Sequence, residues 1–460
     1  MAILTPGVVP ASILVTGKRP AWLKQWAGFA RKARFEHLPE AVMARSRLVI
    51  LDCLGAIIAG RAEPEVAAAK ARLAKTAKAR RAGSPLLHAF MDGTAGTMLE
   101  IDEGNQYARG HPGIHVVPAV LAAARNRKFS GKDAILATAL GYEIGARIGI
   151  ASRLHVTMHP HGTWGVVGAA LAVAKLNKAS AAEIMEVINV ASSLGLTTSR
   201  RTMLEGATVR NTYAGFSNMI GLMAWDLVSS GFTGEVDGVG SVYGGIAADD
   251  WRPGEMVAEL GTRWEIARNY FKRHAACRYN HGALDAMGRI ITQVGGRLDP
   301  ASVASINVDT YVWAAQLDHP APGNMLAAKF SMPFSLATYI VNGAATLDAF
   351  REPARKDAAT RELAARISIN EDVSLTAQLP AFRPARVRLV LTDGRTFEAE
   401  ALTNKGDTED PYAAAEVHEK FMECSTSVIG HAHALQLLDA VLDLDSAPSL
   451  ANILQLTEMS

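Results

Sequence analysis

The sequence predicts a mainly α-helical fold with an α+β second domain, and three observations support this prediction. Up to about residue 268, apolar residues recur at helical spacing, whereas several later stretches alternate apolar and polar residues as half-buried strands do. Ala and Gly are plentiful and aromatic residues make up only 6% of the chain, a composition that suits closely packed helices. A length of 460 residues favours two domains over one.

The first expected helices have recognisable ends. Residues 41–58 form one long helical pattern that stops near Gly60. Residues 116–124 form an apolar helix with Pro118 near its first turn, where proline is tolerated because its missing N–H would have no partner there.

Two serines mark the next helix starts. Ser130 is a suitable N-cap for a helix running to Ile148, and Ser180 caps a helix over 181–194. The segment between them, 163–176, is apolar on all sides and is therefore expected at the centre of the helical domain. A further helix is expected over 216–228.

The expected strands share an alternation of apolar and polar residues: 305–312, 366–370, 387–391 and 395–399. The last two flank Thr392-Asp-Gly394, which is a strong hairpin signal. Helices beginning at Gly282 and Pro333 interrupt the strands. We therefore expect a helical domain over 1–268, an α+β lid over 269–404, and a helical segment over 405–460 that packs back on the first domain.

Charge and cysteine content exclude several classes of protein. The net charge of +2 gives no electrostatic footprint for nucleic acid or an anionic membrane, so neither is expected as a partner. The three cysteines, Cys53, Cys277 and Cys424, form no CxxC pair, and their low number indicates a cytoplasmic setting. No transmembrane span and no signal peptide are expected.

Polar residues interrupt the apolar pattern at four places. The most informative is 100–113, which holds three carboxylates, an arginine and a histidine in a segment that glycines and a proline keep from being one helix. Burying so many titratable groups is costly unless they do chemistry or bind a ligand. The other three polar segments are 155–163, 200–213 and 271–281.

Each candidate residue also has a simpler structural explanation. His111 and His159 are candidates for the site, and the role of His161 stays open. Cys277 fits a small buried residue better than a nucleophile, and His281 fits a helix cap as well as a substrate contact. Three arginines could instead pair with surface acids: Arg200, Arg201 and Arg210.

The cationic residues in these segments indicate a small polycarboxylate as ligand. Arginine and lysine would hold its carboxylates, and histidine exchanges protons near neutral pH because its reference pKa is about 6.5. Proton abstraction next to a carboxylate is then general acid–base chemistry. A metal site ranks lower, since no H-E-x-x-H or similar spacing occurs.

The chain resembles the MmgE/PrpD family of 2-methylcitrate dehydratases, cis-aconitate decarboxylases and iminodisuccinate epimerases. The resemblance runs from about Trp26 to about Gly430. It rests on several motifs in one order: 51–60, His111-Pro-Gly113, Gly141-Tyr-Glu143, His159-Pro160 with Gly168-Ala-Ala170, Gly231-Phe-Thr-Gly234, Lys272 to Cys277, and Lys329-Phe-Ser-Met-Pro333.

The resemblance implies a large helical domain, a smaller α+β lid, a homodimer, and cofactor-independent chemistry in a cleft between the domains. The family's site residues would fall on Glu100, Asp102, His111, His159, Arg210 and Lys272. Familiar members of the family often carry Asp at the position of Glu100 and Lys at the position of Arg210, so the charge is kept at both positions. Polar groups are lost at three positions: Gly104, Cys277 and Phe334.

The leading hypothesis is a dehydratase or hydratase that acts on a 2-hydroxy tricarboxylate such as a 2-methylcitrate-like acid. His111 or Lys272 would take the α-proton, His159 would be the opposing acid, and Arg210 would anchor a carboxylate. An epimerase of imino- or amino-dicarboxylates, a cis-aconitate-type decarboxylase and a non-enzymatic carboxylate-binding dimer are the alternatives. His161, Cys277 and His281 are expected with Glu100 and Asp102 among the substrate-binding residues.

Overall fold

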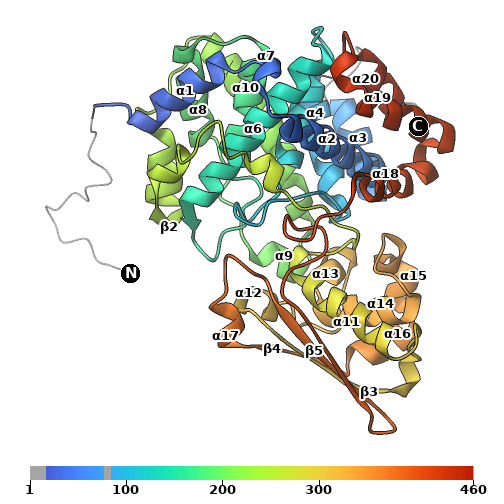
Figure 1. The fold of residues 1–460 in the computed structure, drawn as a ribbon. Helices are drawn as coiled ribbons and strands as arrows, with labels where there is room; N and C mark the ends of the chain where they lie inside the picture. The colour runs from blue at the N-terminus through green and yellow to red at the C-terminus, as the bar shows by residue number, and fades with distance from the viewer. Residues whose placement is uncertain (1–16, 77–83, 459–460) are drawn as a thin grey trace, which may run out of the picture.

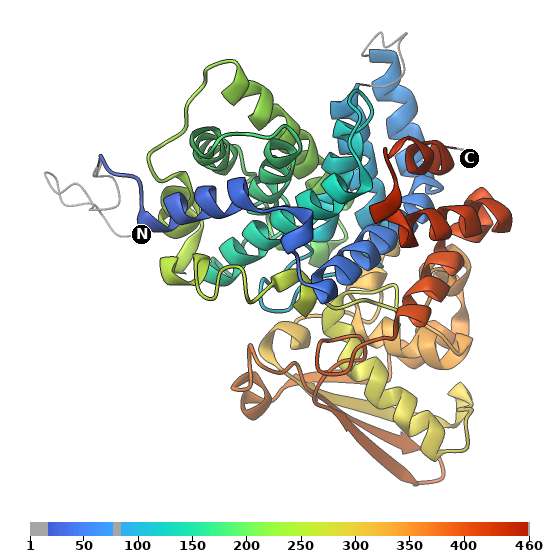
Figure 2. The same ribbon diagram turned by 45° about the horizontal axis from the view of Figure 1, so that its top comes forward.

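The computed structural model describes residues 17–76 and 84–458. Figure 1 shows a large helical body above a smaller module in which a sheet and several helices pack together. The turned view in Figure 2 shows the same two layers, with the first helices lying across the helical body. The expected fold class, a mainly helical chain with an α+β second part, is confirmed.

Five helices build the core of the helical body: α2 (Glu40–Arg61), α4 (Pro85–Met98), α6 (Gly131–Ala151), α7 (Gly165–Leu176) and α10 (Tyr213–Ser229). Helix α7 lies between α6 and α10, and α4 packs between α2 and α10. Gly141 on α6 and Gly168 on α7 allow a close crossing, because a Cβ on either would lie 2.6–2.7 Å from the other's carbonyl oxygen. Helix α7 is almost wholly buried, as its apolar sequence predicted.

Both predicted serine caps are confirmed. Ser130 and Ser180 accept hydrogen bonds from the backbone N–H of the third residue of α6 and of α8 (Ala181–Ser193), and Asp133 and Glu183 complete two capping boxes. Helix α6 is long and apolar enough to cross a membrane by composition, but 94% of its apolar window is buried inside the protein. It is therefore placed as a core helix.

The remaining helices of the body surround this core: α1 (Ala21–Lys32), α3 (Pro64–Thr76), α5 (Val117–Ala123) and α9 (Arg201–Glu205). Two short strands, β1 (Ser152–Leu154) and β2 (Ala248–Trp251), pair antiparallel at the lower edge of the body. The sequence analysis did not predict this pair, because each strand is too short to show an alternation.

The α+β module contains a four-stranded sheet in the order β4-β3-β5-β6. Its strands are β3 (Val303–Thr310), β4 (Ile367–Glu371), β5 (Ala385–Leu391) and β6 (Thr396–Ala401), and β3 pairs parallel with β4. All four strands were predicted. Strand β3 ends two residues earlier than expected, because Val312 begins the short helix α12 (Val312–Ala315).

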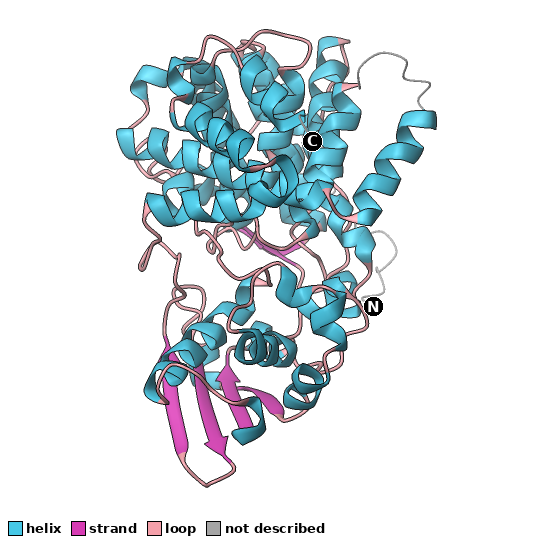
Figure 3. Cartoon of the chain, turned by 90° about the vertical axis from the view of Figure 1, so that its right-hand side faces the viewer, coloured by secondary structure: helices cyan, strands magenta, loops and turns pink. Residues whose placement is uncertain are grey.

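Helices cover the sheet of this module on one side (Figure 3). Helix α11 (His281–Gln293) packs on β5 and β6. Helix α14 (Met332–Asn342) packs between α11 and α16 (Ala358–Ala364). Short helices complete the module: α13 (Met325–Lys329), α15 (Glu352–Lys356) and α17 (Val373–Thr376).

The last helices return to the helical body. They are α18 (Ala414–Ile429), α19 (His431–Leu442) and α20 (Ala451–Glu458), and Figure 1 shows them in red beside the blue α2. Both α18 and α19 contact α2. The domain boundaries at 268 and 404 stay predictions.

Candidate active site

The polar loop 100–113 follows α4 and turns sharply through the middle of the molecule. Two of its non-glycine residues, Glu100 and Arg109, adopt left-handed φ angles of 53° and 55°, which few non-glycine residues do. The Asn105 side-chain oxygen accepts hydrogen bonds from the N–H groups of Tyr107 and Ala108, which closes the loop tip. Such over-determined backbone strain is concentrated at functional sites.

Buried polar groups hold this loop from behind. Glu103 accepts hydrogen bonds from the N–H of Gly113 and the hydroxyl of Tyr142. Asp52 on α2 accepts one from the N–H of Glu103 at 2.8 Å and forms an ion pair with Lys420 of α18. The loop is therefore fastened to two helices that lie far apart in the sequence.

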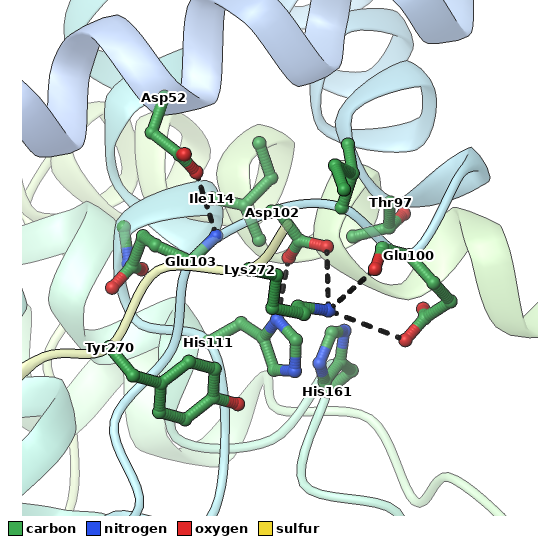
Figure 4. Close-up of polar contacts among 12 residues, drawn as sticks. Asp52, Thr97, Glu100, Asp102, Glu103, His111, Ile114, His161, Tyr270 and Lys272 are labelled. Carbon is green, nitrogen blue, oxygen red and sulfur yellow. Dashed lines mark hydrogen bonds and ion pairs between the residues drawn. The ribbon is translucent and has the colours of Figure 1, made fainter. Parts of the chain in front are cut away.

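His111, Asp102 and Lys272 form a buried chain of charged groups at the inner side of the loop (Figure 4). His111 Nδ1 lies 2.7 Å from Asp102 Oδ2. Lys272 Nζ donates to the carbonyl oxygen of Glu100 at 2.8 Å and lies 3.8 Å from Asp102 Oδ1. The side chains of Asp102 and Lys272 are fully buried.

The charges around Asp102 keep it ionised. Burial by itself raises the pKa of Asp102, but His111, Lys272 and Arg210 together outweigh burial and hold the pKa below its usual value. An ionised Asp102 can only accept, so Nδ1 of His111 carries a hydrogen, and in the neutral ring Nε2 is the free nitrogen. This tautomer is assigned from the hydrogen-bond partners. A free Nε2 is a proton acceptor, and Asp102 stabilises the imidazolium that forms when it takes a proton.

His159 and His161 face His111 from the segment before α7. The His161 ring centroid lies 4.6 Å from that of His111 and 4.8 Å from that of His159. Burial, followed by the charge of Arg210, lowers the pKa of both rings well below the usual histidine value. Both are therefore neutral at physiological pH.

Both ring nitrogens of His159 lie within hydrogen-bond distance of an N–H donor. Its Nδ1 lies 3.0 Å from the backbone N–H of His161, which donates to it. Its Nε2 lies 3.4 Å from Nε of Arg210, which donates to it in a longer contact. A neutral imidazole has one acceptor nitrogen, so His159 can donate to a ligand from Nε2 only when Arg210 turns aside.

Arg210 and Glu100 form a buried ion pair at the side of the histidines. Arg210 also lies over the ring of Phe330, 5.3 Å from its centroid. The η4 turn that carries Arg210 (Thr208–Thr212) packs against α4, which ends just before Glu100. Because Glu100 already neutralises Arg210, this arginine is only partly available to a ligand.

These groups surround one small cavity. Six of the candidate residues line it: Glu100, His111, His159, His161, Arg210 and Cys277. Burial raises the pKa of the Cys277 thiol to about 11, so it is protonated at neutral pH and is no nucleophile.

The other three candidates do not line the cavity. Asp102 and Lys272 lie behind His111, where they can orient it but do not face a ligand. The expected substrate contact of His281 is not found, because Arg278 and the carbonyl oxygen of Ala276 occupy its two nitrogens. The structure places His281 as a support for Arg278, which does line the cavity.

The sequence analysis missed several cavity residues. Arg109, Arg278 and Arg383 were not singled out, although each lines the cavity. Arg200 was treated as a possible surface arginine, but it is only 8% exposed, and its Nε and Nη2 have no hydrogen-bond partner. It stacks on Trp313, 4.7 Å from the ring centroid. A buried guanidinium without a carboxylate indicates that an anion belongs beside it.

Among the described residues, no group of three or more His, Cys, Asp and Glu side chains has the arrangement of a metal site. The clustered histidines are instead stacked edge to face against one another. What they offer a ligand is a proton acceptor and hydrogen-bond donors beside unneutralised arginine.

Comparison with known proteins agrees with this arrangement. The model of the MmgE/PrpD N-terminal domain matches residues 24–248, and that of the MmgE/PrpD C-terminal domain matches 274–445. The chain belongs to the MmgE/PrpD family. The resemblance noted in the sequence is therefore confirmed over most of the chain.

Similar curated proteins in this family are enzymes named cis-aconitate decarboxylase. The one from Aspergillus terreus is 24% identical over 388 residues, covering 78% of each chain. Those from Homo sapiens and Mus musculus are 23% and 22% identical and cover 89% and 86% of this chain, and 89% and 85% of their own. These proteins are lyases by name, and their identity to this chain is too low to transfer a substrate.

Proposed function

We propose that this protein is a lyase that moves a proton at the carbon next to a carboxylate of a small polycarboxylic acid. The observation that carries the proposal is the buried pair of His111 and Asp102, which faces two neutral histidines in a cavity lined by arginine. General acid–base catalysis needs a proton acceptor and a donor within reach of one ligand, and this cavity offers both.

His111 is the proposed base. Its free Nε2 accepts the proton, and the negative Asp102 stabilises the positive ring that results. Lys272 balances the negative charges of Asp102 and Glu100 from behind. In this proposal Lys272 positions the base and does not itself take the proton.

His159 and Arg200 complete the proposed machinery. His159, which lines the same cavity as His111, is the proposed donor to the oxygen on which negative charge develops, with its hydrogen on Nε2 once Arg210 turns toward the ligand. Arg200 has unused donors inside the cavity, so it suits a substrate carboxylate better than Arg210, which Glu100 already neutralises.

Dehydration of a 2-hydroxy tricarboxylate is the leading form of this chemistry. The proton leaves from carbon to His111, the electron pair forms the double bond, and hydroxide departs with a proton from His159 as water. Decarboxylation of a cis-aconitate-like acid is the second candidate, because the similar curated proteins carry that name. Cytoplasmic location and a homodimer remain proposals from the sequence.

A panel of purified acids tests the proposal. Citrate-like, methylcitrate-like, aconitate-like and iminodisuccinate-like acids are incubated with the protein in ²H₂O and followed by NMR and ultraviolet absorbance. A dehydratase gives a new alkene absorbance, a decarboxylase releases carbon dioxide, and an epimerase incorporates deuterium without losing water. Epimerisation alone contradicts the lyase proposal, and so does the absence of all three outcomes for every acid, with no acid bound.

A further inference from the structure

A second pocket lies directly beside the catalytic cavity. The two share three lining residues, Arg109, Tyr279 and Arg383. The second pocket is the larger of the two. A ligand too long for the cavity could therefore extend past the shared residues into the second pocket.

Positive charge dominates the lining of this second pocket. Its arginines outnumber its acids, which are Asp250 and Glu255; the arginines are Arg109, Arg153, Arg252, Arg263, Arg268 and Arg383. Three of these form ion pairs with nearby acids: Arg252, Arg263 and Arg268. In the described part of the chain, the other three form no ion pair with a carboxylate.

The unpaired arginines lie close enough to repel one another. Burial lowers the pKa of Arg109, and the charges of Arg383, Arg252 and Arg153 lower it further. The Arg109 guanidinium donates to the carbonyl oxygen of Ser152 at 3.0 Å, and Arg383 donates to that of Gln106 at 2.7 Å. Like charges gathered at one wall are unfavourable unless an anion binds between them.

The rest of the lining suits a connecting chain. Ile150, Leu379 and the ring of Trp313 form apolar surface in the second pocket. Trp313 also stacks on Arg200, which lines the catalytic cavity. Apolar and aromatic surface beside these arginines suits the carbon chain of a molecule that also carries anionic groups.

We propose that the second pocket is a subsite for a terminal anionic group of the substrate, held by Arg109, Arg153 and Arg383. The substrate is then an acid longer than citrate, with its reacting half among the histidines and a carboxylate or phosphate in the second pocket. This inference rests on the proposed function for the reacting half. Binding of the terminal anionic group in the second pocket does not depend on which reaction the other half undergoes.

Calorimetry with a matched series of ligands tests the subsite. Tricarballylate is compared with three homologues that carry a butyl chain ending in a carboxylate, in a phosphate, or in a methyl group. We expect either charged homologue to bind at least roughly 10-fold more tightly than the methyl-ended one. The tighter of the two charged homologues identifies the terminal group. Equal affinity for charged and methyl-ended chains overturns the proposal.

Arg153→Ala is the matching variant, because Arg153 is exposed and does not line the catalytic cavity. It should reduce the preference for charged chains by several-fold and leave the affinity for tricarballylate unchanged. Arg388→Ala is the control, since it also removes one exposed positive charge but lines neither pocket. An equal loss in both variants would mean a general charge effect and would overturn the subsite.

The two proposals fail separately. If the charged preference holds but no acid of the substrate panel is turned over, the subsite stands and the lyase proposal falls. If acids of the panel react but charged chains bind no better than uncharged ones, the lyase proposal stands and the subsite falls.

Discussion

Asp102 matters at the residue scale because it fixes which nitrogen of His111 is free. Replacing it by Asn keeps the size but allows the amide to stabilise the other tautomer, and it removes the charge that stabilises the imidazolium. We expect Asp102→Asn to lower kcat by about 10²–10⁴-fold with a small change in KM. Steady-state kinetics with the best acid of the panel measures this. A kcat within about threefold of wild type would remove the pair from the mechanism.

Lys329 is a second buried cation, and it gives a pH-dependent prediction. Burial lowers its pKa to about 7, and its Nζ donates only to the carbonyl oxygen of Ala275 at 2.9 Å. The unfolded chain keeps the lysine proton up to about pH 10.5, whereas the folded protein releases it near pH 7. Between these values the unfolded state binds more protons, so the Lys329 contribution to the unfolding free energy rises with pH.

Lys329→Met should therefore flatten the pH dependence of stability between pH 7 and pH 9. Urea unfolding at several pH values measures the unfolding free energy of wild type and variant. The difference between the two free energies should change by up to roughly 1.4 kcal/mol per pH unit. Lys356→Met is the control, because Lys356 is exposed and pairs only with Glu352. If the difference in unfolding free energy between wild type and Lys329→Met does not vary with pH, Lys329 stays charged when buried.

At the residue scale, the sequence predicted which residues belong to the site better than it predicted which residues they contact. His111, His159 and Arg210 stand in polar segments between apolar helices, so they could be singled out. The burial of Arg200 could not, because the ring that covers it, Trp313, belongs to the other half of the chain. Lys272 was predicted to share one cavity with His111, but it lies behind Asp102 and outside the lining, and this position depends on packing that no local pattern encodes.

At the element scale, the loop 100–113 is held in place by close contacts that leave no room for extra atoms. A Cβ on Gly110 would lie 2.5 Å from the buried ring of Trp164. We expect Gly110→Ala to displace the neighbouring His111, to destabilise the protein by about 1–3 kcal/mol, and to lower kcat. Gly254→Ala is the matched control, since nothing lies within 4 Å of its added Cβ. Thermal unfolding and kinetics together check this, and full activity of Gly110→Ala would contradict it.

Elements with local signals were predictable, and elements that depend on distant pairing were not. The capping boxes at Ser130 and Ser180 and the hairpin at Gly394 are set by residues within a few positions of one another. Strands β1 and β2 pair residues 152–154 with 248–251, so only the folded structure reveals them.

At the scale of the whole molecule, Lys420 connects the end of the chain to the site. From α18 it forms an ion pair with Asp52 and donates to the carbonyl oxygen of Ile101 at 2.6 Å. Lys420→Met would leave Asp52 buried without its cation, which costs about 3–5 kcal/mol. Adding Asp52→Asn should recover part of that loss, and urea unfolding of the single and double variants measures it. Additive losses would show that the two residues act independently.

The packing of α18 against α2 was expected from the helical pattern after residue 412, but its contribution to the site was not. In the structure, that return brings Lys420 beneath the acidic loop, so the last helices help to hold the catalytic cavity. The cavity itself is lined from both modules, with histidines from the helical body and Cys277, Arg278 and Arg383 from the second part.

Solvent deuterium exchange is the most direct test of proton transfer by His111. The wild-type protein is incubated in ²H₂O with the acid that it binds best, and NMR follows deuterium at the carbon next to the carboxylate. We predict exchange with wild type and a loss of about 10²-fold or more with His111→Asn, while the affinity for the acid stays within a few-fold. Undiminished exchange in His111→Asn would contradict the account.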